Sequence, residues 1–233
     1  MSYITLSNEI DAVYTRILSH HYRSIAITSS IDGEGVTSMV LALSKRILLA
    51  GQSVLVVDFN SHRPFFQNSI GLPDYTSDKL TPSLIADANQ SFVFTGVCFP
   101  KSKKQLVQLR RPGELEKQIE LWLADFDFVI FDTTPLSRRN QHNIPAQRIA
   151  AAADTCVMMA ITGVTTELIL QESLSKLERV NANLTGLVLN DKHYPKLQDE
   201  LVRVVNRMPN VLKGIKTRIH DWIKQNKLLG MDV

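Results

Sequence analysis

Short apolar runs alternate with segments of helical spacing along most of the chain. The apolar runs are rich in β-branched residues and predict strands at 24–28, 53–58, 92–99, 128–132, 155–161 and 184–189. Apolar residues recur at helical spacing around these runs and predict helices at 7–20, 37–50, 114–125, 145–153 and 165–179. Because strands that alternate with helices form parallel βαβ units, the pattern predicts an α/β fold of three layers with a doubly wound, mostly parallel sheet.

The pattern predicts one domain over residues 1–233. A first helix lies within 1–23, the sheet and its helices occupy 24–190, and further helices follow in 191–233. Residues 60–113 show no clear pattern beyond one strand, and we expect them to form a long excursion over one edge of the sheet. The C-terminal helices are indicated by two apolar stripes, which comprise Leu197, Leu201, Val204, Val205 and Met208, then Leu212, Ile215, Ile219, Trp222 and Ile223.

Composition places the chain among ordinary globular proteins, with 44% hydrophobic and 21% charged residues. A net charge of +3 is too small to indicate nucleic-acid binding, so we expect no nucleic-acid partner. The N-terminal segment does not resemble a secretory signal, and no apolar run is long enough to span a bilayer, which predicts a cytoplasmic protein. Cys98 and Cys156 each lie within an apolar run, and we expect both to be reduced core residues.

Positive charge is concentrated in the last segment. From Lys192 to Val233 there are nine Lys or Arg residues and four Asp or Glu residues. One interpretation is a solvated helical face. The other is a surface that meets an anionic membrane or an acidic partner, which would place the protein at the periphery of the inner membrane.

Residues 24–38 combine an apolar strand, a loop with two glycines and the start of a helix. Backbone N–H groups in such a loop, together with the positive end of the helix dipole, form an anion site that suits phosphate. A phosphate-binding loop normally continues Gly-Lys-Ser/Thr, but this chain has Val36 between Gly35 and Thr37. The sequence therefore predicts a phosphate cradle without its lysine.

Polar residues end three of the other predicted strands: Asp58, Asp132 and Asn190. Asp and Asn are common wherever a strand turns into a loop, so each has an ordinary structural explanation. Because ligands of parallel sheets bind at the carboxyl ends of the strands, the three together predict a nucleotide site. Two carboxylates and the Thr37 hydroxyl would suit Mg²⁺, which prefers a few oxygen ligands and several waters.

Three motifs, in order, resemble those of the bacterial tyrosine kinases (BY-kinases), the polysaccharide-export relatives of the MinD/ParA ATPases. Residues 29–38 resemble the Walker A loop, Ser-x-x-Pro-Gly-Glu-Gly-Lys-Ser/Thr. Residues 54–64 resemble the second motif, in which apolar residues precede Asp-x-Asp-Leu-Arg-Arg-Pro, and residues 126–135 resemble Walker B, Tyr-Asp-x-Val-Ile-Ile-Asp-x-Pro-Pro. The similarity covers about residues 25–190 and implies a P-loop NTPase-like fold.

The resemblance also implies roles for individual residues, with ATP or ADP and Mg²⁺ as the cofactors. Asp58 and Asp132 would be the catalytic residues, and together with Thr37 they would hold the metal. The nucleotide would be bound by Gly33, Glu34, Gly35, Thr37 and Ser38 of the loop and by Asn190, which would approach the base.

Every departure from the family pattern concerns catalysis. Val36 replaces the phosphate-binding lysine, and Ile31 stands where MinD/ParA proteins have an additional lysine. Asn60 replaces the second aspartate of the middle motif, and His62 replaces its first arginine. The C-terminal segment has one tyrosine, Tyr194, where BY-kinases have an autophosphorylated cluster. These differences predict a degenerate member of the family.

Four functions remain open from the sequence. The first is a weak or inactive P-loop protein that regulates or assists exopolysaccharide or capsule biosynthesis and export. Its partner would be a membrane-bound polysaccharide chain-length regulator or another export component. The protein could also form a homo-oligomer. The second is an active ATPase or tyrosine kinase completed in trans, so the sequence leaves enzymatic activity open. The third is a dinucleotide-dependent enzyme, because Gly33, Gly35 and Asp58 imitate part of a Rossmann fingerprint. The fourth is a fold kept as a scaffold only.

Overall fold

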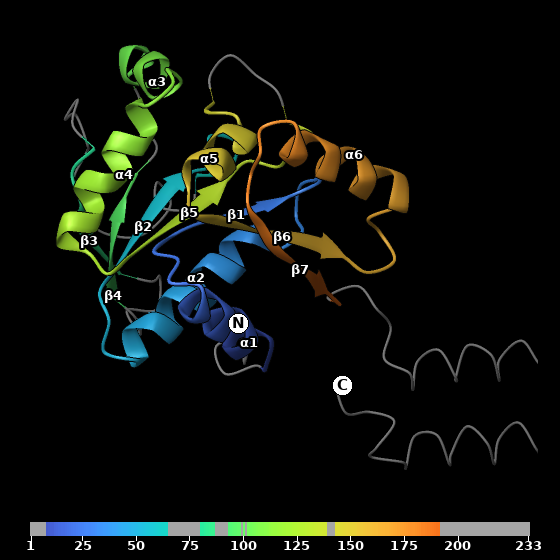
Figure 1. The fold of residues 1–233 in the computed structure, drawn as a ribbon, viewed down its shortest axis with the longest axis horizontal. Coiled ribbons are helices and arrows are strands. Elements are labelled where there is room, and N and C mark those ends of the chain that lie inside the picture. The colour runs from blue at the N-terminus through green and yellow to red at the C-terminus, as the bar shows by residue number, and fades with distance from the viewer. Residues whose placement is uncertain are drawn as a thin grey trace, which may run out of the picture. The chain divides into compact units, whose positions relative to one another are not determined.

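The computed structural model describes residues 8–64, 80–86, 93–98, 100, 102–138 and 143–191. Helices and strands alternate along this part of the chain (Figure 1). In chain order they are α1 (Asn8–Ser19), β1 (Ser24–Ser29), α2 (Val36–Leu49), β2 (Val54–Phe59), β3 (Ser83–Ala86), β4 (Val93–Val97), α3 (Lys103–Leu109), α4 (Glu114–Asp125), β5 (Phe128–Thr133), α5 (Ala146–Ala152), β6 (Thr155–Ile161), α6 (Glu167–Glu178) and β7 (Leu184–Asn190).

The strands form a seven-stranded sheet in the order β3-β4-β2-β5-β1-β6-β7. Every neighbouring pair is parallel except β3 and β4, which are antiparallel at the edge. The expected α/β fold with a mostly parallel sheet is therefore confirmed. The edge strand β3 and helix α3 lie in the excursion at 60–113 and were not predicted, because four and seven residues are too few to establish a period.

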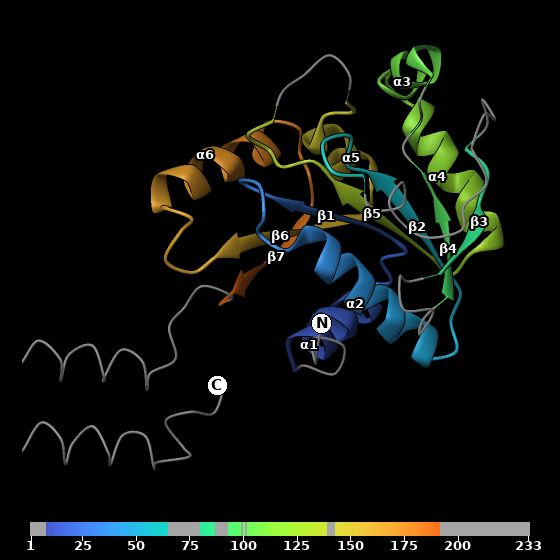
Figure 2. The same ribbon diagram turned by 180° about the vertical axis from the view of Figure 1, so that it is seen from behind.

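Helices cover both faces of the sheet and complete the three layers (Figures 1 and 2). Helices α1 and α2 pack on one face, where Ile17, Leu43 and Ile47 join the inward side chains of the strands. The opposite face carries α3, α4, α5 and α6, with Leu115 and Ile149 among its buried contacts. The four central strands β1, β2, β5 and β6 are buried along their whole length, as expected of a sheet covered on both sides.

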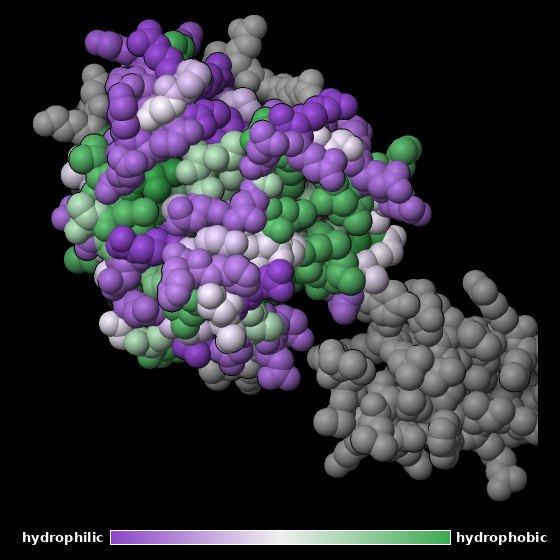
Figure 3. All heavy atoms as spheres, viewed as in Figure 1, coloured by the Kyte–Doolittle hydropathy of each residue, from purple (hydrophilic) through white to green (hydrophobic). Residues whose placement is uncertain are grey.

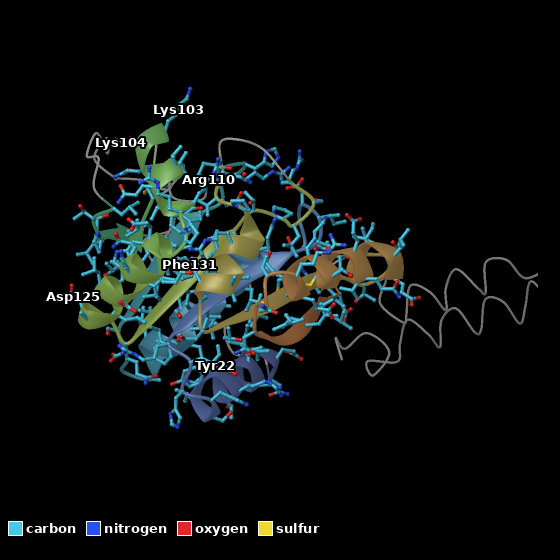
Figure 4. All side chains as sticks on the ribbon, turned by 45° about the horizontal axis from the view of Figure 1, so that its top comes forward. Tyr22, Lys103, Lys104, Arg110, Asp125 and Phe131 are labelled. Atoms are coloured by element: carbon cyan, nitrogen blue, oxygen red, sulfur yellow. The ribbon has the colours of Figure 1, made fainter. Side chains whose placement is uncertain are left out.

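Aromatic side chains fill the core between the sheet and α4. Phe131 of β5 is fully buried, and its ring centroid lies 5.7 Å from that of Phe59 and 6.2 Å from that of Trp122. In Figure 4, Phe131 lies between α4 and α5. Since Phe131 directly precedes Asp132, this packing also sets the position of the carboxylate at the end of β5.

Two aspartates bind the amino ends of the central strands together. The Asp154 carboxylate accepts hydrogen bonds from the backbone N–H groups of Arg23 and Ser24, at 2.7 and 2.8 Å, which aligns β1 with β6. Asp127 accepts from both the backbone N–H and the hydroxyl of Ser53, at 2.7 and 2.8 Å, which aligns β2 with β5. Strands aligned at their amino ends bring their carboxyl ends to a common edge.

Some of the exposed apolar side chains lie on α6 and β7. Leu168 of α6 and Leu187 and Leu189 of β7 are exposed, and Figure 3 shows an apolar surface below α6 and over β7.

The compact unit that contains the sheet ends at Asn190, and 191–233 form a second unit, of which only Asp191 is described. The expected C-terminal helices thus lie outside the described residues, and the single domain over 1–233 stays a prediction. Among the described helices, none is both long and apolar enough to cross a membrane.

We expect Phe131→Ala to lower the free energy of unfolding by about 3–5 kcal/mol, because it leaves a cavity between β5 and α4. Urea denaturation would measure the change. Leu121→Ala, on the exposed side of α4, is the control and should change stability by no more than about 0.5 kcal/mol. Equal losses in the two variants would show that this aromatic core is not what stabilises the sheet.

Candidate functional site

The two aspartates predicted as metal ligands are next to each other in the sheet. Asp58 of β2 and Asp132 of β5 are direct partners in the parallel register, and each is at most 2% exposed. Neighbouring strands lie about 4.8 Å apart, so the two carboxyl groups share one small volume. Two adjacent buried carboxylates are costly unless a proton or a cation lies between them.

The Thr37 hydroxyl completes this group of oxygens. It lies in the first turn of α2 and donates a 2.6 Å hydrogen bond to Oδ2 of Asp132. The other oxygen of Asp132, Oδ1, is buried and has no hydrogen-bond partner. The structure therefore brings together the three residues that the sequence assigns to the metal, and one carboxylate oxygen remains available to a cation or a water.

The pKa of Asp132 is raised from 3.8 to about 8. Burial is the largest cause, and the neighbouring Asp58 carboxylate adds to it by repulsion. Hydrogen bonding from Thr37 and the Asn60 side chain opposes the shift without cancelling it. Asp132 consequently holds a proton near neutral pH unless a cation replaces that proton.

The loop between β1 and α2 has the backbone that a phosphate cradle requires. Gly33 and Gly35 adopt φ values of 85° and 100°, which side chains with a Cβ rarely tolerate. Gly35 is also crowded, because a Cβ at this position would lie 2.6 Å from Nδ2 of Asn190. The loop then enters α2 at Val36, so the first N–H groups of the helix face the same edge of the sheet as the aspartates.

Glu34 holds the loop from inside rather than pointing outward. Its side chain is buried, and Oε2 accepts hydrogen bonds from the backbone N–H groups of Ser30 and Ile31, at 2.6 and 3.0 Å. Oε1 is hydrogen-bonded to the hydroxyl of Thr165, in the turn before α6. This carboxylate thus joins the two ends of the loop and connects them to the β6–α6 turn.

Asn190 lies against the loop at the end of β7. Its Nδ2 donates a 3.0 Å hydrogen bond to the carbonyl oxygen of Glu34. The predicted base-side residue is therefore brought to the cradle, and Ser38 is exposed on the first turn of α2. The contact of Glu34 with Thr165 had no sequence signal, because it joins residues 131 positions apart.

Val36 brings no charge to the loop. It is 7% exposed and belongs to the apolar cluster of α2 and the sheet, with Ile27, Met39 and Val40. Lys45 of the same helix lies nine residues farther along α2. At 1.5 Å per residue this is about 13 Å from Val36, which is too far to reach the loop.

The segment after β5 runs beside the loop. The backbone N–H groups of Leu136 and Ser137 donate to the carbonyl oxygens of Ser29 and Ser30, at 2.8 and 3.1 Å. Arg138 then forms an ion pair with Asp32, and its Nε lies 2.7 Å from Oδ2 of that aspartate. Sequence reasoning missed this arginine, because nothing in the pattern pairs residues 106 positions apart.

The residues present fit Mg²⁺ and a phosphate. Two carboxylates and a hydroxyl are the ligand set that Mg²⁺ accepts while it keeps several waters. Two more buried oxygens have no hydrogen-bond partner, Oγ1 of Thr28 in β1 and Oγ of Ser30 directly after this strand. Asp58, Asp132 and Thr37 would hold the metal, the loop N–H groups would hold the phosphates, and the bound ion would neutralise charge on both.

The strand order does not match the dinucleotide alternative. In dinucleotide-binding sheets the strand that ends on the ribose-binding acid lies next to the first strand. Here β5 separates β1 from β2, so Asp132, not Asp58, ends the strand beside the loop. This order gives both aspartates a place at one site.

Comparison with known proteins agrees with this geometry. No protein-family model matches the chain. It is 27% identical over 186 residues to the tyrosine-protein kinase YwqD of Bacillus subtilis (strain 168), an alignment that covers 75% of this chain and 74% of that protein.

Two solved structures share the fold. The kinase domain of the Escherichia coli tyrosine kinase ETK superimposes with a TM-score of 0.62 at 20% identity, covering 82% of this chain and 80% of that one. Cobyrinic acid a,c-diamide synthase from Mycobacterium smegmatis, with a bound ATP analog and magnesium, gives a TM-score of 0.54 at 18% identity over 80% and 83% of the chains. The resemblance is thereby confirmed at the level of a BY-kinase-like P-loop protein.

The raised pKa of Asp132 predicts how stability depends on pH. Between pH values of about 4 and 8 the folded protein keeps a proton that the unfolded chain has lost, so stability should fall as pH rises through this window. Asp132→Asn removes the effect. In EDTA, its melting temperature relative to the wild type should rise steadily from pH 5 to pH 8.5.

Asp125→Asn is the control, because this carboxylate is exposed at the end of α4 (Figure 4). It should show no such trend. Added Mg²⁺ should raise the melting temperature of the wild type at pH 8 more than that of Asp132→Asn. A difference between Asp132→Asn and the wild type that is the same at every pH would contradict the raised pKa.

Proposed function

We propose that this BY-kinase-like P-loop protein is a degenerate member that binds Mg²⁺ and ATP or ADP but turns ATP over weakly or not at all. Its role would be that of a regulator or accessory factor in exopolysaccharide or capsule biosynthesis and export. The similarity to a tyrosine-protein kinase supports the family, and Val36 supports the degeneracy.

The observation that carries the proposal is the position of Val36. A side chain that is 7% exposed within an apolar cluster supplies no charge to a phosphate. A charge-assisted hydrogen bond to phosphate contributes about 1.5–3 kcal/mol to binding. Losing one donor that is preorganised for the transition state costs about 10²–10³ in rate.

Binding tolerates this loss better than catalysis does. The loop N–H groups, the first turn of α2 and the group formed by Thr37, Asp58 and Asp132 are all in place. They contact the bound nucleotide in its ground state as well as in the transition state, so they favour occupancy. Asn60 adds to the difference, because an amide cannot act as the second carboxylate of the motif.

A second candidate is an active ATPase or tyrosine kinase whose missing cation comes from a partner. The exposed position of Gly33 and Ser38 at the loop favours it, since another chain could approach there. The two candidates differ in whether the purified protein alone hydrolyses ATP.

We expect the purified protein to show no ATP hydrolysis above background, where background is the rate of an Asp58→Ala, Asp132→Ala double variant.

Val36→Lys should tighten binding of MgADP by about 1.5–3 kcal/mol in isothermal titration calorimetry, because it adds an ammonium at the N-terminus of α2. It should also lower the melting temperature, because it removes an apolar side chain from the cluster.

Val36→Met is the matched control, since methionine is unbranched and apolar and should leave nucleotide affinity near that of the wild type. Wild-type turnover that the double variant abolishes would overturn the degenerate assignment. Absence of binding in both the wild type and Val36→Lys would leave the fold as a scaffold only.

We further propose that the partner is a membrane-bound polysaccharide chain-length regulator or another export component. The excess of basic residues in 192–233 supports this, because a cationic segment is attracted to an anionic membrane or an acidic partner. Flotation with anionic vesicles and pull-down with the cytoplasmic tail of such a regulator should both show binding that weakens with salt. Lack of association in both assays at low salt would contradict the proposal.

A further inference from the structure

A cation, Arg138, contacts the loop although it does not belong to the Walker A-like segment at residues 29–38. Among the ion pairs of the described residues, the pair of Arg138 and Asp32 is the one that involves the loop. Asp32 directly precedes Gly33, and Arg138 follows the strand that carries Asp132 by five residues. The arginine thus contacts the loop from the segment that follows β5.

The backbone holds Arg138 in this position. The two residues before it donate hydrogen bonds from Leu136 and Ser137 to the loop carbonyls of Ser29 and Ser30. These hydrogen bonds therefore connect the segment that carries the arginine to the loop. The side chain of Arg138 is 49% exposed, so its guanidinium is open to a ligand at the loop.

We propose that Arg138 replaces the missing lysine as the cation that contacts the phosphates of the bound nucleotide, and that Asp32 holds it in reserve until phosphate arrives. The inference rests on the proposed nucleotide binding. Arginine suits this role because its planar guanidinium binds phosphate through two parallel hydrogen bonds. A half-exposed ion pair is weak, so a polyphosphate that carries several charges outcompetes one carboxylate.

The site around this cation also points to an anion. The buried Ser30 hydroxyl oxygen has no partner, and the loop has the two left-handed glycines that let a ligand approach the backbone. Asp32 and Arg138 neutralise each other in the free protein, so this pair adds no net charge to the loop before the nucleotide binds. Binding would then separate the pair.

The test compares two substitutions that break the same ion pair. Arg138→Gln should weaken MgADP binding about tenfold in calorimetry, because it removes the cation. Asp32→Asn should leave binding unchanged or tighten it a few-fold, because it releases Arg138. Arg46→Gln is the control, since Arg46 forms a similar ion pair with Asp11 away from the loop and should leave affinity unchanged.

A purely structural role for the pair predicts a different result. If the ion pair only braces the loop, Asp32→Asn and Arg138→Gln should weaken binding equally and lower the melting temperature equally, and the proposal is then wrong. It is also wrong if Arg138→Gln binds MgADP as tightly as the wild type.

The Val36→Lys background separates this inference from the proposed function. With the lysine restored, Arg138→Gln should cost less than in the wild type, because two cations then share one role. A cost of the same size in both backgrounds would contradict replacement of the lysine by Arg138. No nucleotide binding by the wild type or by Val36→Lys would overturn the proposed function itself, and this inference with it.

Discussion

The site depends on the placement of two buried aspartates side by side at the carboxyl edge of a parallel sheet. Asp58 and Asp132 are register partners, so their positions follow from the pairing of β2 with β5 and cannot relax without breaking it. Burial, and next the repulsion from Asp58, raise the pKa of Asp132, so a proton or a cation stabilises the pair. The Thr37 hydroxyl donates a hydrogen bond to Asp132, so a cation bound between the two carboxylates would also lie near this hydroxyl.

The loop keeps the form of a phosphate cradle without the lysine that usually occupies it. Internal hydrogen bonds maintain that form: the Glu34 carboxylate joins Ser30 and Ile31 to Thr165, and Asn190 supports the loop from β7. Because these contacts need no ligand, the loop has this form before a ligand binds. It differs from the usual phosphate-binding loop in lacking the charge of the lysine. Loss of the lysine charge would affect binding less than turnover. Binding needs the shape of the loop and its N–H donors, whereas catalysis also needs a charge directed at the transition state.

The charge at the loop has a second source in the tertiary structure. Arg138 lies in the segment that follows β5, and β5 itself carries Asp132. The arginine and the aspartate are therefore close to each other in the chain. A lysine in the loop would be always present, whereas an arginine paired with Asp32 is available only when the pair opens.

The sequence by itself determined the fold class and six of the seven strands of the sheet, and it predicted the residues that end the strands at the candidate site. These features follow from local patterns: apolar runs that end on Asp58 and Asp132, and a glycine loop that leads into a helix. The edge strand β3 and helix α3 were missed because each is too short to show a period. Only the tertiary structure decided that Val36 belongs to the core, that Glu34 turns inward and that Arg138 meets Asp32. These outcomes depend on contacts between residues far apart in the chain, and such contacts leave no mark on the local spacing of apolar and polar positions.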